Sequence, residues 1–258
     1  MDISPLKTIV LVHGGPGGAG ELHPMALRLS ASFEVVESLQ SRYTIAELVD
    51  ELHDDVLAAR AGTVTLLGHS WGAWLALLYA ARHAGTIDNL ILVGCPPLEE
   101  RYVPRILENR LRNLSATDAD ALSSVIRALE RAPNESLMHE LRRLTHLGDN
   151  YDVEEYAGNT HVDARMYDSV WSEAAELRKR GCLLDVASRV SCPLHIIHGD
   201  RDPHPIEGVT EPLDVLNIGY TLYILPRCGH APFAEREARD EFYEVIMKIK
   251  SANLLTRP

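Results

Sequence analysis

The sequence lacks the patterns that mark several large classes of protein. No two of its four cysteines form a C-x-x-C pair, and no cysteine–histidine cluster has zinc-finger spacing. Its twelve histidines are scattered and include no H-E-x-x-H, so the sequence predicts no metal site. No apolar run approaches the ~18 residues that a membrane-spanning helix needs. We therefore expect free thiols, no bound metal and no membrane span.

Positive charge is also scarce. The chain has 25 lysines and arginines against 37 aspartates and glutamates, a formal net charge of −12. This balance argues against nucleic acid and anionic membranes as partners. Residues 1–7 contain no basic region followed by an apolar core, so no signal peptide is predicted and we expect a cytoplasmic protein. Its 258 residues, 46% of them hydrophobic, fit a single α/β domain.

One stretch indicates chemistry directly. The apolar run 63–67 leads into Gly68-His69-Ser70-Trp71-Gly72, and a helical pattern follows over residues 73–81. A serine at a sharp turn between a strand and a helix is typical of a nucleophile elbow. The strained turn needs small residues on both sides, and the helix N-terminus directs its amides toward the serine. The alternative is a serine in an ordinary turn.

A second glycine-rich loop follows the predicted strand 7–12. It reads His13-Gly-Gly-Pro-Gly-Gly18, which is not a phosphate-binding G-x-x-x-x-G-K-[ST], and no acidic residue follows at dinucleotide-binding spacing. A backbone free of side chains can instead approach a carbonyl group closely and donate an amide to an oxyanion. We predict an oxyanion hole made by the amides of Gly15 and Trp71. The residues that donate these amides could each be displaced by one position.

The order of elements predicts the fold. Strands are predicted at 7–12, 33–37, 63–67, 89–94, 193–198 and 220–225, and helices at 22–32, 44–57, 73–81, 107–114, 118–132, 135–144, 172–180 and 237–250. Alternating helices and near-continuous apolar strands indicate an α/β fold with a mostly parallel, doubly wound sheet. The strand-poor block 96–189 interrupts this alternation. We predict that it is an inserted helical cap on a core formed by residues 1–95 and 190–258.

Serine needs a base, and the base needs an orienting acid. Downstream strand ends supply Asp202, in Gly199-Asp-Arg-Asp202, and His230, in Gly229-His230. Such groups gather at the carboxyl ends of strands in open α/β sheets. Asp200 is the alternative acid in the same loop, and Glu99 or Glu100 is a further one after strand 89–94. The predicted triad is Ser70, His230 and Asp202.

These motifs, in this order, resemble those of the α/β-hydrolases over essentially the whole chain. The His-Gly-Gly-Pro-Gly loop and the tryptophan after the serine are similar to the proline-iminopeptidase-like branch. That resemblance implies release of N-terminal residues from peptides, with acidic residues in or near the cap holding the substrate amine. The Asp-x-Arg-Gly segment usual in that branch is absent, because residues 36–41 read Val-Glu-Ser-Leu-Gln-Ser.

Other polar and aromatic residues have a structural and a functional interpretation. His13 and His69 are expected to pack and bond the loops, His198 and His204 to be structural, and Cys228 to occupy a tight turn. Glu99, Glu100 and Trp171 are the candidate substrate-binding residues. Asp149 and Asp152 are further candidates to hold a cationic amine. The alternative is that these four acids form a solvated surface and that Trp171 packs in a core with Met166, Tyr167 and Tyr151.

The sequence thus predicts a serine hydrolase that cleaves an ester or amide of a small-molecule substrate through an acyl-enzyme, without a cofactor. An aminopeptidase like the proline iminopeptidases is the first alternative. A small-molecule binding or sensing protein on the same fold is an alternative of another class, and a lyase or C–C bond hydrolase is a further one. A haloalkane dehalogenase is disfavoured, since its nucleophile would be an aspartate where this chain has Ser70.

Overall fold

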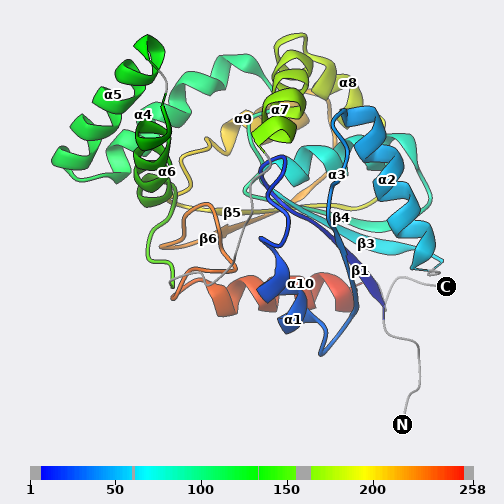
Figure 1. Cartoon of the computed structure of the whole chain (residues 1–258). Helices are drawn as coiled ribbons and strands as arrows, with labels where there is room; N and C mark the ends of the chain where they lie inside the picture. Colours follow the sequence, from blue (N-terminus) through cyan, green and yellow to red (C-terminus); the bar gives the residue numbers. More distant parts are fainter. Residues whose placement is uncertain (1–6, 60–61, 133, 155–163, 253–258) are drawn as a thin grey trace. The chain divides into compact units, whose positions relative to one another are not determined.

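A parallel six-stranded sheet organises the protein. The computed structural model describes residues 7–59, 62–132, 134–154 and 164–252, and Figure 1 shows its elements. The strands lie in the order β2-β1-β3-β4-β5-β6. Their bounds are β1 Thr8–Val12, β2 Glu34–Ser38, β3 Val64–His69, β4 Ile87–Val93, β5 Leu194–Gly199 and β6 Thr221–Leu225. Strands β1, β3 and β4 are buried on both faces, as their apolar sequences predict.

The chain forms two compact units. The first comprises residues 1–100, 157–197 and 206–223, and the second residues 101–156, 198–205 and 224–258. The helices of the first unit are α1 His23–Leu29, α2 Ile45–Ala58, α3 Trp71–Arg82, α7 Ala164–Lys179, α8 Cys182–Ala187 and α9 Glu207–Val215. Those of the second are α4 Val103–Asn113, α5 Ala116–Arg131, α6 Glu135–Asp149 and α10 Arg239–Ala252. The core and cap boundaries predicted from the sequence stay a prediction.

The core of the first unit fills the space between the sheet and α2, α3 and α8. Val10, Leu66 and Leu90 on the sheet share one buried cluster with Leu52 of α2 and Trp74 of α3. Burying each such side chain contributes about 1.5–3 kcal/mol. Helix α1 covers the opposite face of the sheet (Figure 1). Helices on both faces confirm the doubly wound fold class.

Helix α2 begins as its sequence predicts. The Thr44 hydroxyl accepts a hydrogen bond from the Glu47 amide at 3.3 Å, and the Glu47 carboxylate accepts one from that hydroxyl at 2.8 Å. This cap satisfies an otherwise unpaired amide at the helix N-terminus.

In the second unit, α5 and α6 pack around a small core of Leu122, Val125 and Leu144. Helices α4 to α6 are strongly amphipathic and charged on their outer sides, which explains why the sequence predicted helices here and no strands. The helix bounds differ from prediction mainly where apolar spacing is weak. Helix α7 begins at Ala164 rather than at 172, α6 runs on to Asp149, and the short α8 was not predicted.

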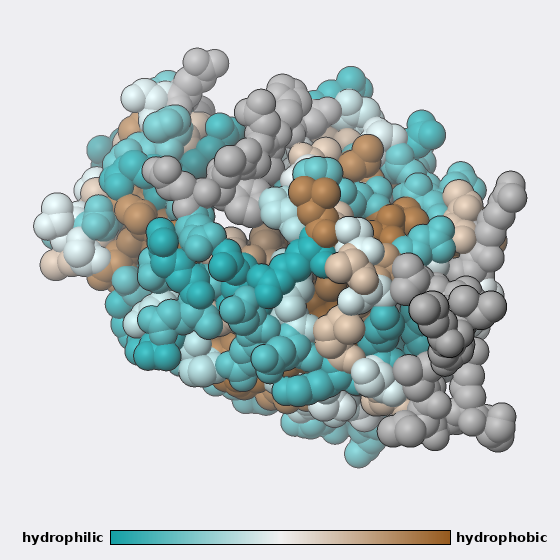
Figure 2. All heavy atoms as spheres, turned by 90° about the horizontal axis from the view of Figure 1, so that it is seen from below, coloured by the Kyte–Doolittle hydropathy of each residue, from teal (hydrophilic) through white to brown (hydrophobic). Residues whose placement is uncertain are grey.

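Among the described residues, no helix is both long and apolar enough to cross a membrane. Hydrophilic residues form large areas of the face drawn in Figure 2, with smaller hydrophobic patches between them. Residues 1–6, for which no signal peptide is predicted, lie outside the described residues.

Replacing Gly72 is expected to destabilise the protein strongly. A Cβ on Gly72 would collide with the backbone carbonyls of Val12 and His13, which cannot move away as a flexible side chain could. We expect Gly72→Ala to cost more than about 3 kcal/mol of unfolding free energy, or to prevent folding. Gly219→Ala is the matched control, since a Cβ there meets nothing within 4 Å. Urea unfolding of both variants measures the difference, and equal midpoints would contradict this account.

Candidate active site

Ser70 occupies a strained turn between β3 and α3. Its φ is 54° and its ψ −123°, a conformation that L-residues rarely adopt. The turn is held because the Ser70 amide donates to the Val93 carbonyl at 2.9 Å and the Ser70 carbonyl accepts from Ala73 at 2.9 Å. Backbone strain held in place by its surroundings is typical of functional sites. The strand–turn–helix context predicted for Ser70 is confirmed.

The two flanking glycines allow this turn. A Cβ on Gly68 would collide with the Gly72 carbonyl, and one on Gly72 with the carbonyls of Val12 and His13 at the end of β1. The crossing segments therefore approach more closely than any side chain permits.

The glycine-rich loop after β1 lies against the elbow. A Cβ on Gly14 would come within 3.0 Å of the Ser70 Cβ. The Gly14 amide donates to the Glu21 carboxylate at 2.6 Å, so it already has an acceptor. Gly15 has a φ of +46°, which favours glycine. These contacts disfavour Gly14 as an oxyanion donor and favour the predicted Gly15.

His13 and His69 have the structural roles that the sequence analysis preferred. The His13 ring nitrogens contact the carbonyl oxygens of Gly14 at 2.8 Å and Leu39 at 3.1 Å. The Nδ1 atom of buried His69 lies 3.2 Å from a carboxylate oxygen of Glu21. Gln40 accepts a hydrogen bond from the Trp71 indole at 2.8 Å and donates one to the His13 carbonyl at 2.9 Å. These contacts connect the loop to the residues on both sides of Ser70.

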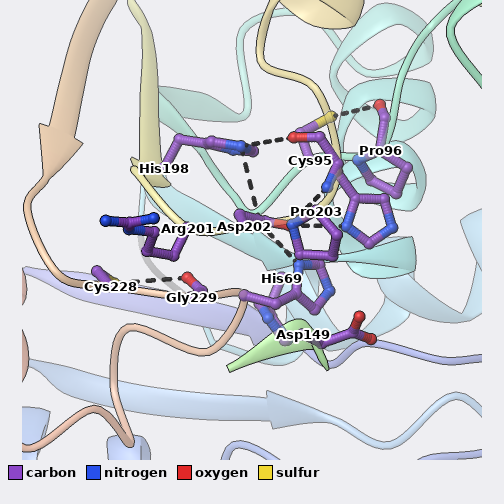
Figure 3. Close-up of polar contacts among 12 residues, drawn as sticks. His69, Cys95, Pro96, Asp149, His198, Arg201, Asp202, Pro203, Cys228 and Gly229 are labelled. Atoms are coloured by element: carbon purple, nitrogen blue, oxygen red, sulfur yellow. Dashed lines mark hydrogen bonds and ion pairs between the residues drawn. The ribbon is translucent and has the colours of Figure 1, made fainter. Parts of the chain in front are cut away.

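In the second unit, the side chains of Asp202 and His230, the predicted acid and base, lie within hydrogen-bond distance. The His230 Nδ1 lies 2.8 Å from Asp202 Oδ2. The other oxygen, Oδ1, accepts from the His204 amide at 2.9 Å and from His204 Nδ1 at 2.8 Å. His198 is directed toward the same carboxylate, with its Nε2 3.8 Å from Oδ2 (Figure 3). The same Nε2 contacts the His204 carbonyl at 2.9 Å. Asp202 is therefore held on both oxygens.

Charge around Asp202 keeps it ionised. Its side chain has no exposed surface, and burial alone would raise its pKa, but His230, His198 and His204 together lower that pKa well below the usual range. The pKa of His204 is lowered, because its ring is largely withdrawn from water and faces His230 with 4.4 Å between ring centroids. An ionised Asp202 beside His230 is the state that a base–acid pair requires.

The loop carrying His230 is fixed by main-chain contacts. The His230 amide donates to the Asp149 carbonyl at 2.7 Å. The fully buried Glu235 accepts from the amides of Gly229, Tyr151 and Asp152 at 2.8, 2.8 and 2.6 Å. Burial of Cys228 raises the pKa of its thiol, as suits a small residue in a turn. Glu235 was not predicted from the sequence, because a single glutamate five residues after His230 matches no motif.

The alternative acids have other contacts. Asp200 accepts from the Cys228 amide at 3.2 Å. Glu100 pairs with Arg178 at 2.8 Å, and Asp149 makes two contacts with Arg110, at 2.5 and 3.0 Å. Trp171 stacks between Trp74 and Tyr167, at centroid distances of 6.0 and 6.1 Å. The substrate-binding roles of Glu99, Glu100 and Trp171 stay predictions.

One cluster among the described residues has the geometry to hold a metal ion. Ligand atoms of Asp202, His204 and His230 lie within 4.8 Å of one another. The Nδ1 atoms of His204 and His230 are already hydrogen-bonded to Asp202, each at 2.8 Å. A cation there would have to displace those protons, so the cluster fits a hydrogen-bonded acid–base pair better than a metal site.

Glu21 should make the protein sensitive to acid. Burial alone would raise the pKa of its carboxyl, but His69, His13 and the Gly14 amide lower it from 4.5 to about 2. A depressed folded-state pKa stabilises the fold above the unfolded-state value of about 4.5, and this stabilisation is lost as pH falls toward 2. In Glu21→Gln, the unfolding free energy should fall less over that pH range than in wild type, by at most about 3 kcal/mol. Urea unfolding at pH 5 and pH 3 measures this change. The same pH dependence in wild type and variant would contradict it.

Comparisons with known proteins agree with this architecture. VinJ matches with a TM-score of 0.71 at 19% identity, covering 97% of this chain and 92% of that one. Proline iminopeptidase of Mycobacterium smegmatis matches with a TM-score of 0.64 at 17% identity, covering 94% of this chain and 88% of that one. The enol-lactonase of Burkholderia xenovorans LB400 matches with a TM-score of 0.60 at 19% identity, covering 97% of this chain and 94% of that one. These likenesses establish the fold, and no curated protein matches the sequence. The model of the Alpha/beta hydrolase family matches residues 9–245, and the chain therefore belongs to that family.

Proposed function

We propose that the protein is a serine hydrolase that cleaves an ester or amide of a small molecule through an acyl-enzyme. The hydrogen bond between His230 Nδ1 and Asp202 carries the proposal. A neutral imidazole that donates from Nδ1 has its unprotonated nitrogen at Nε2, the atom that acts as general base in a serine triad. The membership in a hydrolase family and the strained serine support the same conclusion.

In the proposed reaction, His230 Nε2 takes the proton of the Ser70 hydroxyl as Oγ attacks the substrate carbonyl carbon. The amides of Gly15 and Trp71 stabilise the resulting oxyanion. The tetrahedral intermediate collapses, the bond to the leaving group breaks, and His230 returns the proton to that group. Water then attacks the acyl-enzyme by the same steps, releasing the acid and restoring Ser70.

Among substrates, we favour small esters over peptides with a free N-terminus. An aminopeptidase like the proline iminopeptidases needs a carboxylate to hold the amine. Glu100 and Asp149, two acids nominated for that role, are already paired with Arg178 and Arg110. An acid paired with arginine attracts an amine less strongly than a free one.

A matched substrate panel tests this choice. We would compare p-nitrophenyl acetate and butyrate with aminoacyl p-nitroanilides that carry either a free or an acetylated amine. Turnover of the simple esters, with acetylation changing the anilide rates less than about 3-fold, is expected. Turnover confined to free-amine anilides would favour the peptidase alternative. Ligand-induced stabilisation without turnover of any substrate would favour a binding or sensing protein.

A further inference from the structure

We propose that Gln40 and Glu21 form a polar clamp that positions the oxyanion hole by joining the loop 13–15 to the elbow on both sides of Ser70. The clamp is defined as these two side chains and the four residues that they contact: His13, Gly14, His69 and Trp71. The proposal rests on the serine-hydrolase function proposed above for the same site.

Gln40 forms the first arm. Its amide oxygen accepts from the Trp71 indole at 2.8 Å, and its amide nitrogen donates to the His13 carbonyl at 2.9 Å. The residue is 3% exposed, and its backbone takes a φ of +51°, which is uncommon for a residue other than glycine. Both ends of one buried side chain are thus used, one on the loop and one on the residue after the nucleophile.

Glu21 forms the second arm. One carboxylate oxygen accepts from the Gly14 amide at 2.6 Å, and the other lies 3.2 Å from Nδ1 of His69. This arm joins the next loop residue to the residue before the nucleophile. It also occupies the Gly14 amide, so the loop offers the Gly15 amide instead.

This arrangement matters because an oxyanion hole works by preorganisation. Its donors must lie about 2.7–3.1 Å from the position of the developing negative charge. One proposed donor, Gly15, is on a glycine-rich loop that has little conformational preference of its own, while the other, Trp71, is at a helix N-terminus. The clamp holds the two segments at a fixed separation. Gln40 and Glu21 are positioning residues, since they act through the backbone amides.

The test uses four variants of the full chain. Gln40→Leu removes both contacts of the first arm at similar volume. Gln40→Glu keeps an acceptor for the Trp71 indole but cannot donate to the His13 carbonyl as a carboxylate. Glu21→Gln keeps an acceptor for the Gly14 amide but removes the charge beside His69. Glu176→Gln, at an exposed site on α7, is the control.

We expect kcat on the best ester to fall about 10- to 100-fold in Gln40→Leu and Gln40→Glu, and about 10-fold in Glu21→Gln, with KM within about 3-fold of wild type. The control should match wild type. Unchanged kcat in folded Gln40 and Glu21 variants, or a loss confined to KM, would overturn the proposal. The two milder variants keep the test valid if Gln40→Leu does not fold.

A second readout does not depend on turnover. Gln40 is the single glutamine of the chain, so glutamine labelled with ¹⁵N at the side chain gives one amide signal. We expect the protons of this amide to exchange slowly with water in wild type. They should exchange faster in Gly14→Ala, because this substitution would move the loop that contains His13. Rapid exchange in wild type would overturn the clamp. Slow exchange in a protein that hydrolyses no substrate would preserve the clamp's contacts and reject the proposed function instead.

Discussion

Ser70→Ala is expected to lower kcat/KM on any ester substrate by about 10⁴-fold or more. Without Oγ no acyl-enzyme forms, and only the oxyanion hole and substrate binding remain to accelerate attack by water. The substitution should leave the fold intact, because the Ser70 contacts that hold the turn are made by its backbone amide and carbonyl. Steady-state kinetics with a thermal unfolding curve measures both effects.

The control for this prediction is Ser124→Ala. Its hydroxyl donates to the Asp120 carbonyl at 2.8 Å and accepts from the Arg127 guanidinium at 3.2 Å, on the exposed side of α5. Activity of Ser70→Ala within 10-fold of this control would show that Ser70 is not the nucleophile.

Asp202→Asn is expected to cost about as much, near 10⁴-fold in kcat, for a reason specific to this site. Two donors from His204, its amide and Nδ1, face Oδ1 of Asp202. In the variant they should select the asparagine oxygen, which leaves the NH₂ group facing His230 Nδ1. His230 would then have to accept at Nδ1 and carry its proton on Nε2, the wrong tautomer for a base.

Asp200→Asn separates the two acids of this loop. Asp200 accepts only a 3.2 Å hydrogen bond from the Cys228 amide among its described side-chain contacts, and an asparagine oxygen can keep that bond. We expect its activity to remain within about 3-fold of wild type. Rates measured over a range of pH compare the two variants. A large loss of activity in Asp200→Asn with a small loss in Asp202→Asn would show that the acid has been assigned to the wrong residue.

The sequence allowed prediction of the elements whose physical cause is local. The elbow at Ser70 follows from two glycines between a strand and a helix, and the start of α2 follows from Thr44 and Glu47. The pairing of Asp202 with His230 followed from the rule that functional groups collect at the ends of parallel strands, and the structure brings the two within 2.8 Å.

The parts that could not be predicted depend on tertiary contacts. Gln40 lies where the proline-iminopeptidase pattern is absent, so the sequence offered no reason to select it. Gln40 and its partners His13 and Trp71 follow the ends of the parallel strands β2, β1 and β3, and these ends meet only in the fold. Glu21 and Glu235 are single acids whose importance comes from the backbone amides around them. His204 was expected to be structural, and its two bonds to Asp202 could not be inferred from spacing alone.

The central claim is that Ser70 is an activated nucleophile that depends on His230. Labelling with a fluorophosphonate probe, followed by peptide mapping, tests it most directly in wild type and His230→Ala. We predict that the probe modifies the peptide containing Ser70 in wild type and that the rate falls at least about 100-fold in His230→Ala. No labelling of the folded wild-type protein, or equal labelling in both, would contradict the account.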